Sequence, residues 1–133
     1  MIKEVCSPSL LLQASSNELQ KLRETLGVHT CDRRPPRSVI AARFPSFRIE
    51  ECFTENDELY NPDLRETLDE RRIRLASAIE EIFSTDDSIY IAISGHGGAI
   101  RSILEVLGHR DFELKTGGIL PVVVKVSMAQ ITE

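Results

Sequence analysis

The sequence of 133 residues predicts a single domain of the α/β class, in which helices and strands alternate along the chain and pack in layers. Residues 89–93 form a short apolar run rich in β-branched side chains, which is typical of a buried strand. Apolar residues recur at helical spacing both after this run, in residues 100–107, and before it, in residues 67–83. A strand between two helices indicates layered α/β packing.

A glycine-rich turn joins the predicted strand to the helix that follows it, with the sequence Ser94-Gly95-His96-Gly97-Gly98. In open α/β sheets, ligands bind at this carboxyl end of a strand. The first turn of the new helix offers unpaired N–H groups and the positive end of the helix dipole, which favour an anion. Glycine lets the backbone approach that anion closely. The turn therefore predicts a phosphate site at His96, Gly97 and Gly98.

His96 has two interpretations. It is either a turn histidine whose polar atoms are satisfied by the backbone, or a histidine that binds phosphate or transfers protons. Glycine turns also begin many helices for packing reasons alone. The glycines on both sides, with a strand before and a helix after, favour the second interpretation.

The helix upstream begins at a capping-box pattern, in which Thr67 is followed three residues later by Glu70. Its apolar face is expected to pack on the sheet. The members of that face keep three- and four-residue spacing: Leu68, Leu75, Ile79, Ile82 and Phe83.

The other expected elements are shorter. We expect a helical turn within residues 18–26, a helix at 36–44 and an extended segment at 47–49, with a strand that ends near residues 5–8. Residues 119–126 predict a last strand, with Pro121 at its start or on a sheet edge. Only two long strands result, fewer than a parallel sheet normally has, so a strand is missing.

Composition excludes several classes of partner. The net charge of −5 argues against nucleic acid, and no apolar run reaches the roughly 20 residues that span a bilayer. Three cysteines without a CxxC spacing suit free thiols in a reducing compartment. We therefore expect a cytoplasmic protein that binds neither nucleic acid nor membrane.

Two groups of polar residues allow a structural and a functional interpretation. His29, Cys31 and Cys52 supply three of the four ligands of a zinc site, so we expect no metal and no cofactor. Arg33 and Arg34 form either a solvated charge cluster, which we favour, or the rim of an anion site, because guanidinium groups match phosphate oxygens.

Several separated segments resemble fungal members of the histidine phosphatase superfamily, which have the phosphoglycerate mutase-like fold. The likeness extends over about residues 19–126, and the segments that carry it follow the same order as in the family: 22–34, 53–67, 94–100, 108–112 and 116–118. The resemblance implies a three-layer α/β/α fold and a phosphorylated small molecule as substrate.

The resemblance also implies a set of site residues. Family members carry an Arg-His-Gly motif on their first strand, and its histidine is transiently phosphorylated. A second histidine, which His96 matches, holds the phosphoryl group, and two arginines clamp it. An acidic residue in a Leu-x-Glu segment protonates the leaving group, and Glu24 matches this acid. Judged without the family, Glu24 is an exposed carboxylate near the end of a helix.

The chain departs from the family pattern in two ways. It contains no Arg-His-Gly, and no arginine follows Ser7-Pro8, where family members have a phosphate-binding one. The resemblance therefore predicts a single partial domain, residues 1–133, that matches the back portion of such an enzyme and lacks the first strand. Loss of that strand exposes a sheet edge, through which the chain is expected to form a homo-oligomer.

Three functions follow from these observations. The first is a phosphomonoester hydrolase or mutase relative that is inactive or incomplete as this chain. The second is a pseudoenzyme that binds a phosphorylated ligand or a protein partner. The third, a generic anion- or nucleotide-binding α/β domain, lacks both a GxGxxG motif and a P-loop.

Overall fold

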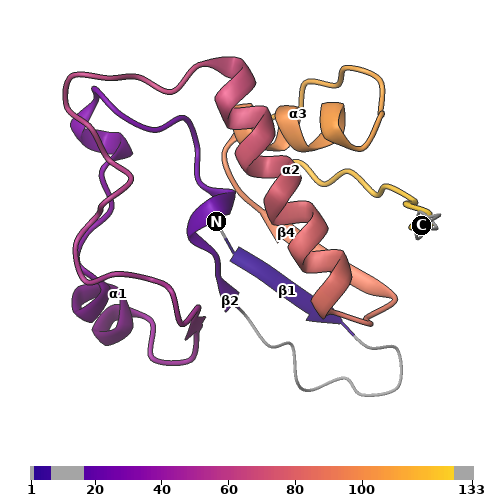
Figure 1. Cartoon of the computed structure of the whole chain (residues 1–133). Helices are drawn as coiled ribbons and strands as arrows, with labels where there is room; N and C mark the ends of the chain where they lie inside the picture. The colour runs from indigo at the N-terminus through magenta and orange to yellow at the C-terminus, as the bar shows by residue number, and fades with distance from the viewer. Residues whose placement is uncertain (1, 7–16, 128–133) are drawn as a thin grey trace, which may run out of the picture.

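The computed structural model of the chain describes residues 2–6 and 17–127, which form helices packed on a small sheet (Figure 1). The α-helices are α1 (Arg37–Arg43), α2 (Leu68–Thr85) and α3 (Gly97–Val106). Two short 3-10 helices precede them, η1 (Gln20–Leu22) and η2 (Thr30–Asp32). The strands are β1 (Ile2–Cys6), β2 (Asn17–Glu18), β3 (Arg48–Ile49) and β4 (Tyr90–Ser94).

The sheet has the strand order β3-β2-β1-β4. β1 runs antiparallel to both of its neighbours, and its register on β4 places Ile2 opposite Ser94 and Cys6 opposite Tyr90. β2 and β3 are parallel and have only two residues each. β4 is therefore an edge strand, and β1 is its one partner within the described residues.

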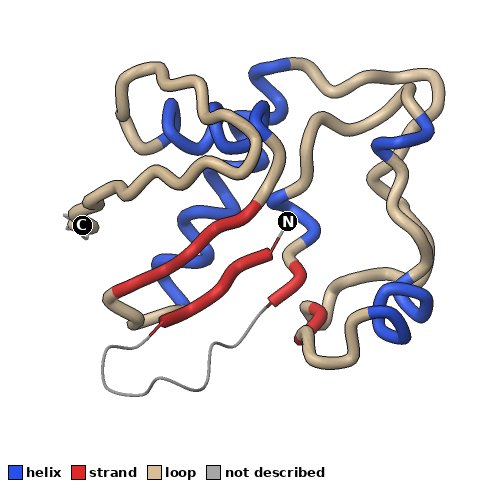
Figure 2. The backbone as a smooth tube through the Cα atoms, turned by 180° about the vertical axis from the view of Figure 1, so that it is seen from behind, coloured by secondary structure: helices blue, strands red, loops and turns tan. Residues whose placement is uncertain are grey.

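Helices α2 and α3 both pack on the face of the sheet that carries Ile91 and Ile93, and in the reverse view the strands stand in front of α2 (Figure 2). β4 alternates accordingly: Ile91 and Ile93 pack against the helical core, whereas Tyr90, Ala92 and Ser94 are exposed. The expected strand is confirmed, but it is buried on one face rather than on both. No helix of the described residues covers the opposite face, so that part of the chain forms two layers.

The core lies between α2, α3 and the inner face of β4. The capping box of α2 is confirmed, because the Glu70 N–H donates to the Thr67 hydroxyl at 3.3 Å and the Thr67 N–H donates to the Glu70 carboxylate at 2.8 Å. Leu68 is 61% exposed, so its expected place on the apolar face was wrong. The buried residues of the core are Leu22, Leu75, Ala78, Ile79, Ile82, Ala99 and Ile103.

The shorter predicted elements are also present. η1 supplies the expected turn, α1 the expected helix, and β3 the expected extended segment. On α1, Ile40 is buried, whereas Val39 and Phe44 are exposed, because this helix lies away from the sheet (Figure 1). β1 ends at Cys6, and Ser7 and Pro8 lie outside the described residues.

The expected last strand is wrong. Residues 119–126 are irregular, and Ile119 and Val123 are 92% and 100% exposed. A strand exists only where a second backbone pairs with it. No described strand pairs with this segment, and Pro121 has no N–H to donate.

Candidate functional site

The start of α3 is the centre of the candidate site. β4 ends at Ser94, and the N-cap of α3 is His96, whose extended backbone (φ −75°, ψ 154°) turns the chain into the helix. Its side chain is exposed and makes no capping hydrogen bond. The N–H groups of Gly97 and Gly98 have no hydrogen-bond acceptor within the described part of the chain. The predicted strand, glycine turn and helix are thus present.

Glu24 lies at the same helix end. Its Oε2 accepts a hydrogen bond from the N–H of Ala99 at 3.0 Å, across 75 residues of sequence. A Cβ on Gly98 would lie 2.5 and 2.8 Å from the two carboxylate oxygens. Only glycine lets the carboxylate come this close to the helix start. The structure thus brings Glu24 to the turn that contains His96, Gly97 and Gly98.

Arg74 fixes the loop that carries Glu24. Its guanidinium donates to the backbone carbonyls of Lys21, Arg23 and Glu24 at 2.6, 3.0 and 3.2 Å. The same side chain pairs with both carboxylate oxygens of Glu66 at 2.6 Å. These contacts tie the loop to α2.

Arg71 contacts the Glu24 carboxylate directly. Its Nη1 donates to Glu24 Oε1 at 3.0 Å and to the Thr25 hydroxyl at 2.6 Å. Its Nε donates to the Ser102 hydroxyl at 3.0 Å. Arg71 therefore joins α2, α3 and the loop of Glu24 at one point.

The surroundings of Glu24 favour its charged form. Burial raises the pKa of its carboxyl, but hydrogen bonds from Thr25 and from the Ala99 N–H lower it further than burial raises it. The positive charge of Arg71 acts in the same direction. The pKa of Glu24 is therefore lower than usual, and the group is a carboxylate at neutral pH.

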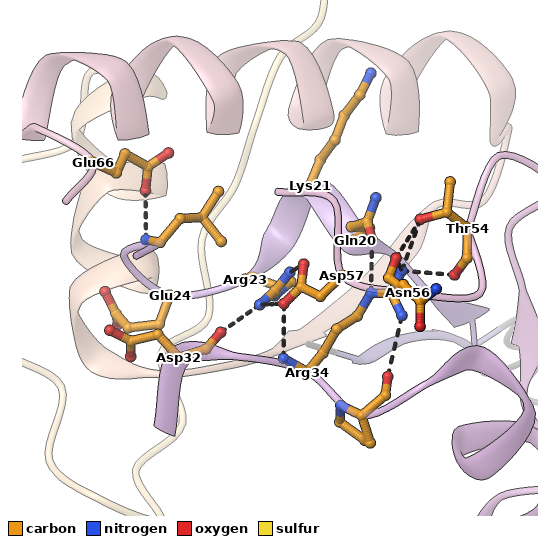
Figure 3. A network of polar contacts seen from close by, with 12 residues as sticks. Gln20, Lys21, Arg23, Glu24, Asp32, Arg34, Thr54, Asn56, Asp57 and Glu66 are labelled. Atoms are coloured by element: carbon orange, nitrogen blue, oxygen red, sulfur yellow. Dashed lines mark hydrogen bonds and ion pairs between the residues drawn. The ribbon is translucent and has the colours of Figure 1, made fainter. Parts of the chain in front are cut away.

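A second polar network fixes the adjoining loops (Figure 3). The Arg23 guanidinium donates two hydrogen bonds of 2.8 Å to the carboxylate of Asp57, whose side chain is 1% exposed. Burial raises the pKa of Asp57, but the hydrogen bonds from Arg23 and from the Arg34 N–H outweigh it and lower this pKa.

For Arg34, both interpretations of the arginine pair, a solvated charge cluster and the rim of an anion site, are wrong. Its side chain is buried, stacks 4.1 Å over the Phe53 ring, and donates to the carbonyls of Thr54 and Asn56 at 2.7 Å each. Because these donors are already used, Arg34 is neither solvated nor free to bind an anion. Arg33 is exposed and lies over the ring of Tyr60.

The described residues contain no group of three His, Cys, Asp or Glu side chains arranged to hold a metal ion. Cys31 and Cys52 are free, exposed thiols. None of the described helices is long and apolar enough to cross a bilayer.

Analysis of the sequence did not single out Arg71, Thr25 or Ser102. A signal for Arg71 was present, because it lies four residues before Leu75 on the apolar side of α2. A charged residue within an apolar stripe has to be paired when it is buried. Thr25 and Ser102 carried no such signal, since their contacts depend on the tertiary fold.

Comparisons with known proteins identify relatives of this chain. The chain is 50% identical over 105 residues to "Probable phosphoglycerate mutase" of Arthroderma benhamiae, which covers 79% of the chain and 31% of the relative. It is 36% identical to "Phosphomutase-like protein 3" of Candida albicans over 78% of the chain and 33% of the relative. It is 35% identical to "Probable phosphoglycerate mutase PMU1" of Saccharomyces cerevisiae over 84% of the chain and 42% of the relative.

The likeness defines an α/β protein of the phosphomutase-like class. The chain belongs to the phosphoglycerate mutase-like proteins of the histidine phosphatase superfamily. It spans between 31% and 42% of the length of the relatives named above. No family model and no solved structure matches it.

Proposed function

We propose that this chain binds the phosphoryl group of a small molecule at the turn formed by His96, Gly97 and Gly98, and that it does not turn this molecule over on its own. One observation carries the proposal. The Glu24 carboxylate accepts from Ala99 N–H at 3.0 Å, so the two residues that match the family's acid and its second histidine belong to one helix end.

The chemistry of the turn supports an anion. The N–H groups of Gly97 and Gly98 are free to donate to phosphoryl oxygens, and the helix dipole favours negative charge at this end by about 0.3–1 kcal/mol. The exposed imidazole of His96, at the N-cap of the same helix, supplies a further N–H donor. The proposed site thus has three donors at one helix end.

Turnover requires more than binding. Phosphoryl transfer through a covalent intermediate needs a nucleophile in line with phosphorus and positive groups around its equatorial oxygens. The resemblance assigns these to an Arg-His-Gly motif and two arginines, and the sequence contains no such motif. Binding that does not favour the transition state produces no rate.

The family fold also bears on this proposal. The resemblance implies a third layer and further parallel strands, the first of which carries the nucleophile. The described residues do not form these parts. Any activity of a longer protein would depend on them.

The cytosolic location expected from the cysteines stays a prediction.

Calorimetric titration with inorganic phosphate tests the binding. The wild-type chain should bind, and His96→Ala should bind about tenfold more weakly, which corresponds to about 1.4 kcal/mol. His109→Ala is the matched control, because His109 is half-buried away from the turn and its ring hydrogen-bonds the carbonyl of its neighbour Arg110. Equal affinities for the two variants would contradict the proposal.

A phosphatase assay tests the second part. With p-nitrophenyl phosphate from acidic to neutral pH, the wild-type chain should show no rate above that of His96→Ala. A clear excess, or a trapped phosphohistidine in the intact protein, would show that the polypeptide is an enzyme by itself.

A further inference from the structure

Arg71 is a buried charged residue, and the cost of removing its guanidinium from water has to be offset by hydrogen bonds or ion pairs. It is 9% exposed and lies on the core side of α2, one turn before Leu75. A buried guanidinium is stable only when its donors are paired. The partners of Arg71 therefore indicate what it does.

Those partners lie on two other parts of the fold. Ser102, 1% exposed on α3, accepts from Nε at 3.0 Å and fixes the guanidinium against that helix. Nη1 is then directed at the loop after η1, where it reaches Glu24 Oε1 at 3.0 Å and Thr25 Oγ1 at 2.6 Å. Without Arg71, the loop that carries Glu24 and Thr25 would lose its side-chain connection to Ser102 on α3.

The two carboxylate oxygens of Glu24 accept hydrogen bonds from different parts of the fold. Oε1 accepts from Arg71, from the Thr25 N–H at 2.9 Å and from the Thr25 hydroxyl at 3.1 Å. Oε2 accepts from the Ala99 N–H and is thereby aimed at the first turn of α3. Because Arg71 and Thr25 hold Oε1, Oε2 is left to accept from the start of the helix.

The charged groups around Glu24 are few among the described residues. Arg71 pairs with its carboxylate, and Arg74 reaches only its backbone carbonyl. Ser102 and Ala99 on α3, and Thr25 on its own loop, are uncharged, and His96 stands in the turn before α3. Arg71 is thus the cation that contacts the carboxylate.

We infer that Arg71 is a positioning residue for the proposed phosphate site: anchored on Ser102, it aims the Glu24 carboxylate at the start of α3. The link between Arg71 and phosphate binding rests on the proposed function. The contacts of Arg71 with Glu24 and Ser102 are present in the ligand-free chain and do not depend on it. They give the helix start an acidic group of fixed position beside the N–H groups of Gly97 and Gly98.

The experiment follows the Glu24 side-chain carboxyl by carbon-13 NMR while the pH of the ligand-free protein is changed. The wild-type group should titrate below the ordinary pKa of a glutamate side chain. In Arg71→Gln the midpoint should move up and the Ala99 amide should shift, and Arg71→Lys should restore part of the change because it keeps the charge. Arg72→Gln is the matched control, since Arg72 is exposed and pairs with Asp69 and Glu105 instead.

Ser102→Ala keeps the inference testable if Arg71→Gln fails to fold. This variant retains every charge and removes only the anchor, so the Glu24 midpoint should move in the same direction by less. An unchanged midpoint and an unchanged Ala99 amide in these variants would overturn the inference. Since no ligand is added, that result would be independent of the phosphate titration.

Discussion

At the scale of single residues, Glu24 is the group whose place most affects the start of α3. Its carboxylate accepts a hydrogen bond from the Ala99 N–H at this helix end, and its lowered pKa keeps it charged. A carboxyl whose pKa is lower in the folded state adds stability that is present above its unfolded pKa. That contribution is lost as the pH falls through the folded-state value.

Gly98 tests this contact at the residue scale. In Gly98→Ala the new Cβ would lie 2.5 Å from a Glu24 oxygen and 3.0 Å from Arg71 Nη1, so the carboxylate has to leave the helix start. We expect the free energy of unfolding to fall by about 1–3 kcal/mol, as when hydrogen-bonded polar groups lose their partners, less the roughly 1 kcal/mol that alanine gains as the better helix former. Chemical denaturation measures this.

Gly97→Ala is the control for this prediction. A Cβ at Gly97 meets nothing within 4 Å, and alanine is the better helix former by about 1 kcal/mol. Stability should therefore stay or rise. If both variants behave alike, the close approach of Glu24 to Gly98 is not what the structure describes.

At the scale of elements, the parts that were predictable are those with strong local signals. The capping box and apolar spacing gave α2, and the β-branched run before the glycine turn gave β4 and α3. Residues 119–126 have the same local signal as β4 but lack a neighbouring strand, so the prediction there was wrong. The link from Glu24 to Ala99 spans 75 residues, and no local pattern encodes it.

Ile79 tests the packing of α2. It is 4% exposed within the core between the helices and the sheet. Ile79→Ala should lower the free energy of unfolding by about 2–5 kcal/mol, as large-to-small core changes do. Ile73→Ala is the matched control, because Ile73 is 71% exposed on the same helix and should cost within about 0.5 kcal/mol. Similar losses for both would mean that the buried face of α2 is assigned wrongly.

At the scale of the whole molecule, apolar surface stays uncovered. Helices pack on one face of the sheet, and β4 offers an edge without a second partner among the described strands (Figure 2). Ile89 is 83% exposed and Tyr90 58%, and Val123 is fully exposed in the irregular segment after α3. Exposed strand edges and apolar patches favour association.

We therefore expect the isolated chain to self-associate or to have low stability. Sedimentation velocity at several concentrations should show the mean mass rising with concentration. Val123→Asp should reduce the rise, whereas Leu64→Asp, at a 68% exposed apolar position before α2, should leave it unchanged. A compact monomer at every concentration, with a high melting temperature, would contradict this expectation.

Amide NMR with added phosphate is the sharpest test of the proposed anion site at the start of α3, beside Glu24. The amides of Gly97 and Gly98 should shift first and saturate together, followed by Ala99, whose N–H already donates to Glu24. The amides of Gly117 and Gly118, in a loop after α3, serve as reference signals and should not move. Shifts confined to other regions, with Gly97 and Gly98 unchanged, would contradict the account.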